Sequence, residues 1–217
     1  MQGKGDGILL ALEGEKMIAL KTHPAVFISV AFLLLGSAFV VFRLIVRRGY
    51  RLCGQLTLAT SAFQLIVFAI LMSFPYLFNP PEWTMFWLLA GPTFSQQQIL
   101  GMVTIVLGVI VAFGTMAWFG LRRAFGLATQ GLITTGPYRL TRNPQILGGY
   151  LMVIGATVQW PSWYSLIWIV LYGLIGHWMI LTEEEHLQKV LGEEYKFYCE
   201  RTPRYLIPVR KSRKGST

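Results

Sequence analysis

Residues 163–181 read WYSLIWIVLYGLIGHWMIL and contain no Asp, Glu, Lys or Arg. A helix needs about 20 apolar residues to cross a hydrocarbon core of about 30 Å, so this run predicts a transmembrane helix. The composition of the whole chain agrees, because 54% of its residues are apolar and only 13% are charged, which is unusual for a soluble domain. We therefore expect an all-α fold, a polytopic membrane helical bundle.

Comparable apolar runs recur along the chain and predict about five transmembrane helices in total. Four lie upstream, at residues 24–42, about 52–72, about 99–119 and 144–160. The run at residues 83–94 is too short for a crossing and predicts an interfacial or re-entrant segment. The N-terminal residues lack the long apolar core and the cleavage site of a signal peptide, so the first span is expected to be its own targeting signal.

Lysine and arginine are concentrated in alternate connections, which indicates the orientation of the chain. They fall between the first two spans, between the third and fourth, and after the fifth, whereas residues 73–98 carry none. Because basic loops stay in the cytoplasm, the N-terminus is expected outside and the C-terminus inside, in the inner or plasma membrane of a cell. The net charge of +9 is explained by this topology and by anionic lipid headgroups, so no nucleic-acid partner is expected. Cys53 and Cys199 are expected to be reduced thiols, and no metal site is expected.

Acidic residues gather directly after the last span, within TEEEHLQKVLGEEYKFYCE at residues 182–200. Apolar residues recur there at helical spacing, so the fifth span is predicted to continue into the cytoplasm as an amphipathic helix. His177 lies inside the span, where an ionisable side chain is costly and is a functional candidate. Seven residues separate it from Glu184, which places both on nearly the same helix face. Alternatively, His177 only bonds a carbonyl of a neighbouring helix.

A second polar segment, TGPYRLTRNPQILG at residues 135–148, precedes the fourth span. Pro144 suits the first position of a helix and Asn143 suits its N-cap, so the span is predicted to start there. The positive helix end and Arg142 then form an anion site near headgroup depth. Tyr138 and Arg139 follow a Gly-Pro turn. The aromatic ring of Tyr138 suits a planar ligand, and the guanidinium of Arg139 suits a ligand that bears a carboxylate.

A cationic loop and a carboxylate-rich helix on the same side of the membrane suit a ligand with separate positive and negative ends. S-adenosylmethionine is such a ligand: its amino group and sulfonium attract glutamates, its carboxylate attracts arginine, and its adenine rests on apolar or aromatic surface. It is the cofactor that we expect.

Three segments resemble the integral-membrane methyltransferases, the family that includes isoprenylcysteine carboxyl methyltransferase and the phospholipid N-methyltransferases. They are GPYRLTRNPQILGG, EEEHLQKVLGEEYKFY and RTPRYLIP, and the resemblance covers roughly residues 100–208. The chain departs from the family pattern at Asn143, Ile146 and Leu191, and it is therefore closer to the broader group of relatives than to the prenylcysteine enzymes. The domain organisation that we expect is an N-terminal extension at residues 1–98, with two transmembrane helices and an outer loop. Residues 99–217 are then a methyltransferase-like core with three transmembrane helices and a cytoplasmic cofactor-binding tail.

The resemblance implies which residues build the cofactor site. The predicted cofactor-binding residues are Tyr138, Arg139, Arg142, Asn143, Pro144, Gln145, Leu147, Gly148, Glu183, Glu184, Leu187, Tyr195 and Tyr198. Methyl transfer from a sulfonium mainly requires positioning, although an ammonium or thiol acceptor must first lose a proton, for which His177 or Glu184 is the candidate base. Arg204 is expected either to orient the charged end of the acceptor or to contact headgroups. The acceptor is expected to be lipid-like or prenylated, to carry a carboxylate, amine or thiol, and to enter laterally from the bilayer.

Two other classes of function remain open from the sequence. One is a membrane reductase of the sterol type that uses NADPH, and the other is a non-catalytic lipid-binding membrane protein. Gly108 and Ala112, four residues apart in the third span, mark either a packing face within the chain or a dimer face, which leaves the oligomeric state open.

Overall fold

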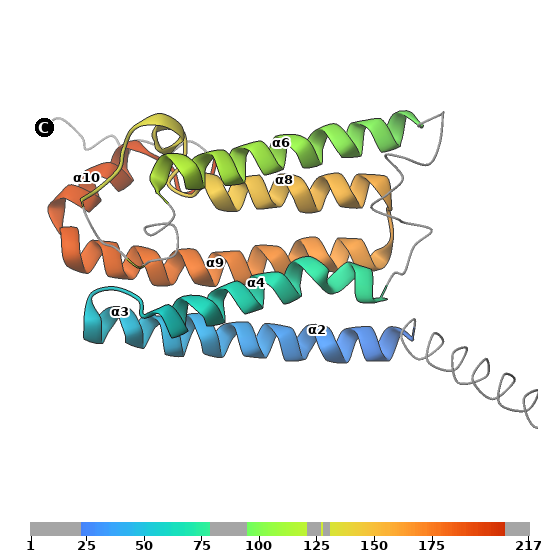
Figure 1. Cartoon of the computed structure of the whole chain (residues 1–217), viewed down its shortest axis with the longest axis horizontal. Coiled ribbons are helices and arrows are strands. Elements are labelled where there is room, and N and C mark those ends of the chain that lie inside the picture. The colour runs from blue at the N-terminus through green and yellow to red at the C-terminus, as the bar shows by residue number, and fades with distance from the viewer. Residues whose placement is uncertain (1–22, 79–94, 121–126, 128–130, 207–217) are drawn as a thin grey trace, which may run out of the picture.

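The structure is a computed structural model, and it describes residues 23–78, 95–120, 127 and 131–206. All regular elements of the described residues are helices, which lie alongside one another in a bundle (Figure 1). This confirms the predicted all-α class. The apolar run at residues 83–94 lies outside the described residues, as do residues 1–22.

The N-terminal helices form an antiparallel pair. Helix α2 (Pro24–Phe39), the π-helical segment η1 (Val40–Val46) and α3 (Arg47–Cys53) form one continuous rod of 30 residues. The rod ends at Gly54, whose φ of 68° favours glycine. Helix α4 follows at Leu58–Phe78. The predicted start of the second span at residue 52 was therefore wrong, and the arginines expected in a loop lie instead on the last turns of a helix.

Helices α6 (Gln96–Phe119) and α8 (Pro144–Gln159) lie side by side in Figure 1. Pro144 opens α8, as the sequence predicted. A Cβ on Gly108 would lie 2.6 Å from the carbonyl oxygen of Gly148, so the two backbones touch at this point. Ala112 contacts Gly148 in the same way. The small residues of the third span therefore mark a packing face within the chain.

The last span is longer than its apolar run. Helix α9 covers Trp163–Leu191 and starts with a capping box at Ser162, so the predicted continuation of the helix past its apolar run is confirmed as far as Leu191. The chain then turns at Gly192, where φ is 54°, and continues as α10 (Glu193–Arg201). The predicted amphipathic extension is thus two helices with a bend between them.

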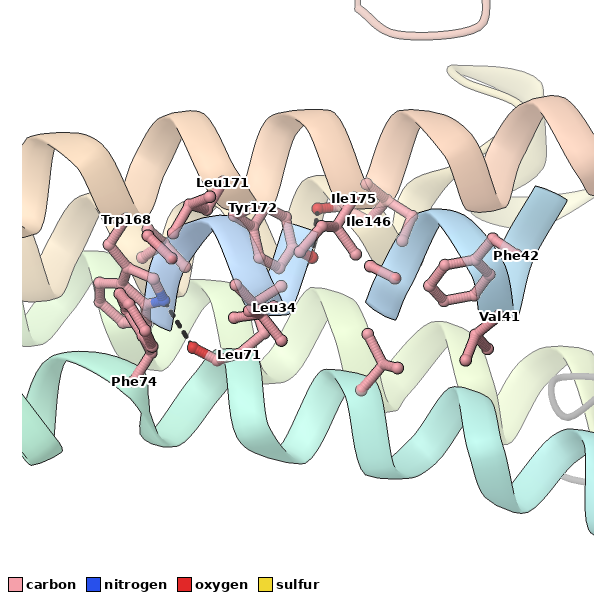
Figure 2. Packing of buried hydrophobic residues seen from close by; sticks show 14 of the residues in the cluster. Leu34, Val41, Phe42, Leu71, Phe74, Ile146, Trp168, Leu171, Tyr172 and Ile175 are labelled. Atoms are coloured by element: carbon pink, nitrogen blue, oxygen red, sulfur yellow. Dashed lines mark hydrogen bonds between the residues drawn. The ribbon is translucent and has the colours of Figure 1, made fainter. Parts of the chain in front are cut away.

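The hydrophobic core joins α2, α4, α8 and α9 (Figure 2). The indole N–H of Trp168 donates to the backbone carbonyl of Leu71 at 2.8 Å. That carbonyl lacks its usual helical partner, because Pro75 has no N–H to offer. The hydroxyl of Tyr172 donates to the carbonyl of Ile146 at 3.2 Å and joins α9 to α8.

Three helices of the described residues are long and apolar enough to cross a membrane: Pro24–Cys53, Gln96–Phe119 and Trp163–Leu191. Helices α4 and α8 run beside them (Figure 1). The protein is therefore an integral membrane protein. In the same view, α3, the end of α9, α10 and the start of α8 lie at one end of the bundle, and this end carries the candidate site.

Candidate functional site

Three side chains from separate segments form an ion-pair cluster at this end of the bundle. Glu184, near the end of α9, lies 3.0 Å from Nη1 of Arg142 and 2.6 Å from Nη2 of Arg204. Nε of Arg204 donates to both carboxylate oxygens of Glu184 at 3.1 Å, so its guanidinium binds the carboxylate through more than one hydrogen bond. These hydrogen bonds raise the pKa of the Arg204 guanidinium. One carboxylate therefore holds the start of α8 and the C-terminal tail together.

The tail after α10 is fixed across the loop before α8 by backbone contacts. The amide N–H of Arg142 donates to the carbonyl of Pro203 at 2.9 Å. The hydroxyl of Thr141 and the side-chain amide of Asn143 donate to the carbonyl of Arg204 at 3.0 and 3.1 Å. Asn143 occupies the predicted N-cap position, but its side chain makes no capping hydrogen bond because it serves the tail instead.

Aromatic rings line the side of the site toward α6 and α10. Tyr138, in the short 3-10 helix η2 (Gly136–Arg139), packs against Phe119 with ring centroids 5.1 Å apart. The hydroxyl of Tyr198 donates to the carbonyl of Tyr138 at 2.7 Å. Burial raises the pKa of both phenols well above the ordinary value, so both stay protonated and uncharged at physiological pH.

These groups surround a cavity of about 60 Å³. Its lining includes Arg142 and Glu184 from the ion-pair cluster and Glu183, whose carboxylate has no hydrogen-bond donor among the described residues. Nε of Arg142 and Nε2 of Gln145 are buried, and neither has a hydrogen-bond partner within the described part of the chain. Buried polar groups are normally paired, so the unpartnered Nε of Arg142 at this cavity is a feature of ligand sites.

The structure brings most of the predicted cofactor-binding residues together and separates the others. Those that line the cavity are Tyr138, Arg142, Asn143, Glu183, Glu184, Leu187, Tyr195 and Tyr198. Arg139 is exposed and lies outside it. Pro144 and Gly148 are buried in α8, where Gly148 packs against α6. Gln145 and Leu147 are half-buried beside them and do not line the cavity.

His177 lies outside the cavity but is tied to the same tail. Its Nδ1 lies 2.9 Å from the hydroxyl of Tyr205, the residue after Arg204. His177 and Glu184 thus contact adjacent tail residues, as their shared helix face suggested. The alternative prediction was that His177 bonds a carbonyl of a neighbouring helix, but the hydrogen bond described for His177 is to the Tyr205 side chain.

Sequence reasoning missed several residues of this site. Phe119 and residues 131–133 line the cavity, and the thiol of Cys199 accepts a hydrogen bond from Nη1 of Arg142 at 2.7 Å. Tyr205 could have been predicted as a site residue, because it follows Arg204 directly in the tail motif RTPRYLIP. Nothing in the sequence brings Cys199 to Arg142 or Phe119 to Tyr138, because these pairs arise only from the packing of α6 and α10 on the loop before α8.

Fold and site together define a helical integral membrane protein with a polar, aromatic-lined site at one end of its bundle. Residues 96–194 match the phospholipid methyltransferase family. The match confirms the resemblance to the integral-membrane methyltransferases over this part of the chain, and it supports a membrane methyltransferase. No curated protein and no solved structure shows significant similarity to the chain.

Proposed function

We propose that the protein is an S-adenosylmethionine-dependent methyltransferase that acts on a lipid-like acceptor held in the membrane. The observation that carries the proposal is the cluster of Arg142, Glu184 and Arg204 beside an aromatic-lined cavity at the end of two membrane helices. The family match over residues 96–194 supports the reaction class. The proposed arrangement puts the N-terminus outside and the site at the cytoplasmic face of the inner or plasma membrane, and it keeps residues 99–217 as the catalytic unit.

The side chains of the site have the donors and acceptors that this cofactor requires. Arg142, with a spare buried Nε, would hold the carboxylate of the cofactor. Glu183 and Glu184 would accept hydrogen bonds from its amino group or ribose hydroxyls. The rings of Tyr138 and Tyr198 offer an apolar surface for adenine. The cofactor, when bound, supplies a methyl group that its sulfonium charge activates for in-line displacement.

A cavity of about 60 Å³ is much smaller than the roughly 300 Å³ or more of typical small-molecule sites. Glu184 lines the cavity and is engaged by the ion pair with Arg204, so we propose that this contact limits the space available to a ligand. Cofactor binding would therefore move the Arg204 side chain away from Glu184 and free both groups. The released guanidinium is then available to orient the charged end of the acceptor.

The acceptor would approach from the bilayer along the face of α9 that carries His177. A carboxylate acceptor needs no base, whereas an ammonium or thiol acceptor must first lose a proton. The hydrogen-bonded pair of His177 and Tyr205 is positioned to take that proton at Nδ1 once the tail moves. Exclusion of water by the tail would protect the reacting groups.

Titration calorimetry with S-adenosylmethionine tests the proposal, with NADPH as the control ligand. We expect saturable binding by the protein in detergent and in lipid nanodiscs. Glu184→Gln should weaken it by about 100-fold, because it removes a charge-assisted contact worth about 3 kcal/mol. Glu183→Gln should weaken it as well, without breaking any described contact of the folded protein.

Glu200→Gln is the matched control, since Glu200 is exposed on α10 and outside the cavity. It should bind the cofactor as the unaltered protein does. Binding of NADPH in place of S-adenosylmethionine would favour the reductase class. A folded protein that binds neither ligand in detergent or in lipid would contradict an enzyme and favour a lipid-binding protein.

A further inference from the structure

A second cavity lies on the opposite side of α9 from the candidate site. It is a groove of about 410 Å³ between α3 and the end of α9, and we call it the α3–α9 groove. Its charged lining residues are Arg47, Arg51, Glu185 and Lys189, and Tyr50 and His186 also line it. None of them lines the cavity around Glu184, so the groove is a separate feature of the molecule.

The charge of the groove is positive after its internal ion pair is taken into account. Glu185 accepts from Arg43 at 2.8 Å and from Arg47 at 2.6 Å, so its carboxylate is fully engaged by two arginines. Arg51 and Lys189 are exposed, and neither has an ion-pair partner in the part of the chain that the structure describes. Among the described lining residues, two cations without an ion-pair partner therefore face an opening whose one carboxylate, Glu185, is already neutralised.

His186 adds a buried polar atom to this cationic opening. The side chain is only 6% exposed, and its ring stacks on Tyr50 with centroids 4.2 Å apart. Its Nε2 is buried and has no hydrogen-bond partner among the residues that the structure describes. A buried polar atom without a partner calls for a ligand or a water, and the neighbouring cations favour an anionic oxygen.

We propose that the α3–α9 groove binds the phosphate of an anionic phospholipid headgroup. Arg51 and Lys189 would hold the phosphate oxygens, and Nε2 of His186 would donate to the same group. This proposal does not rest on the methyltransferase activity, because it concerns other residues and another face of α9.

The surroundings of the groove favour a lipid over a soluble phosphate compound. Arg51 and Lys189 stand near the ends of two helices that are long enough to span the membrane (Figure 1). Leu52 and Val190, which follow them directly, are 72% and 52% exposed, so apolar surface adjoins each cation. Basic pockets between membrane helices at the cytoplasmic surface are known to hold anionic headgroups. A bound lipid would also join the N-terminal helices to α9 beside Glu185.

Native mass spectrometry and thermal unfolding with phosphatidylglycerol test this site. We expect the unaltered protein to bind phosphatidylglycerol in preference to phosphatidylcholine and to be stabilised by it. The double variant Arg51→Gln/Lys189→Gln should bind about 25-fold more weakly, since one cation near the membrane surface contributes about fivefold. His186→Phe keeps the ring stacked on Tyr50 but loses Nε2, and should weaken binding by about fivefold.

Arg48→Gln/Arg201→Gln is the matched control, because it removes the same charge from exposed positions outside the groove. It should change binding by less than about threefold, within the range of general surface attraction. The proposal is overturned by an equal loss in this control, or by a protein that does not distinguish the two lipids. Equally tight binding of glycerol 3-phosphate would also overturn it, in favour of a soluble phosphate compound.

Discussion

Two helix interfaces in this bundle are built in opposite ways. Helices α6 and α8 touch through backbone atoms at glycines, and a Cβ on Gly155 would lie 2.6 Å from the carbonyl of Gly101. Helix α9 meets α2 and α4 through large side chains such as Leu34, Phe74 and Trp168 (Figure 2). In a membrane, where lipid is as apolar as a leucine side chain, close backbone contact is an effective way to hold two helices together.

The difference matters because the two interfaces carry different parts of the protein. Phe119 is the last residue of α6 and Arg142 lies just before the start of α8, at the same end of the pair, so the rigid contact between the two helices fixes the spacing across the candidate cavity. The side-chain interface attaches the N-terminal helices, which lie outside the family match at residues 96–194. A glycine interface leaves no room for substitution, whereas a large side-chain interface can repack.

The largest effect is expected for Gly108→Ala in the glycine interface. The added methyl would lie 2.6 Å from the carbonyl of Gly148 and 2.7 Å from the amide nitrogen of Met152, and neither backbone atom can move aside easily. We expect a loss of about 3 kcal/mol in stability, measured by thermal unfolding in detergent. Gly114→Ala, on the same helix with nothing within 4 Å, is the control and should be neutral or slightly stabilising. Equal behaviour of the two variants would contradict the packing.

A smaller effect is expected for Trp168→Phe in the side-chain interface. The substitution keeps an aromatic ring but leaves the carbonyl of Leu71 without a donor, since Pro75 cannot supply one. Hydrogen bonds between membrane helices contribute about 0.6 to 1.7 kcal/mol, so we expect a loss of about 1 kcal/mol. Trp163→Phe, at a ring that is 40% exposed, should cost less. A loss as large as that of Gly108→Ala would remove the contrast between the two interfaces.

Tyr198→Phe tests how far the rigid region extends around the cavity. It deletes the hydrogen bond to the carbonyl of Tyr138 and should cost about 1 kcal/mol, seen as a lower unfolding temperature. Burial raises the folded pKa of Tyr198, so the stability linked to its neutral form is complete below about pH 10 and declines as the pH rises further. The variant should lose less stability than the unaltered protein above that pH. An identical alkaline decline in both would assign it to other groups.

The sequence predicted the elements that depend on local chemistry. Pro144 at the start of α8 follows from the preference of proline for the first position of a helix and was found where expected. The end of the first helix at Gly54 was missed, because a hydropathy window extends the second span back across the glycine. The convergence of the loop before α8 with the end of α9 was predicted from charge complementarity and from the family resemblance.

Contacts that depend on the direction of a side chain were beyond the sequence. The run Glu183, Glu184 and Glu185 consists of identical residues, yet Glu184 faces the tail and Glu185 faces η1 and α3. A step of one residue turns a helix by about 100°, so the role of each carboxylate depends on which neighbours surround α9. Those neighbours come from parts of the chain far apart in sequence.

The smallest effect is expected for Glu185→Gln, which weakens the only ionic contact described between α9 and the N-terminal rod. The two ion pairs involve side chains that are 18%, 36% and 38% exposed, so solvent and salt screen them. We expect a loss of about 0.5 kcal/mol at low ionic strength and none at about 1 M salt, measured by unfolding in detergent without anionic lipid.

Glu193→Gln is the control for this variant, because Glu193 pairs with Lys196 on the exposed surface of α10 alone. It should have no measurable effect at any salt concentration. If instead Glu185→Gln lowered stability strongly and equally at low and high salt, its ion pairs would be shielded from solvent. The attachment of the N-terminal helices would then depend on fixed polar geometry as much as the α6–α8 pair depends on glycine, and the two interfaces would be equally intolerant of change.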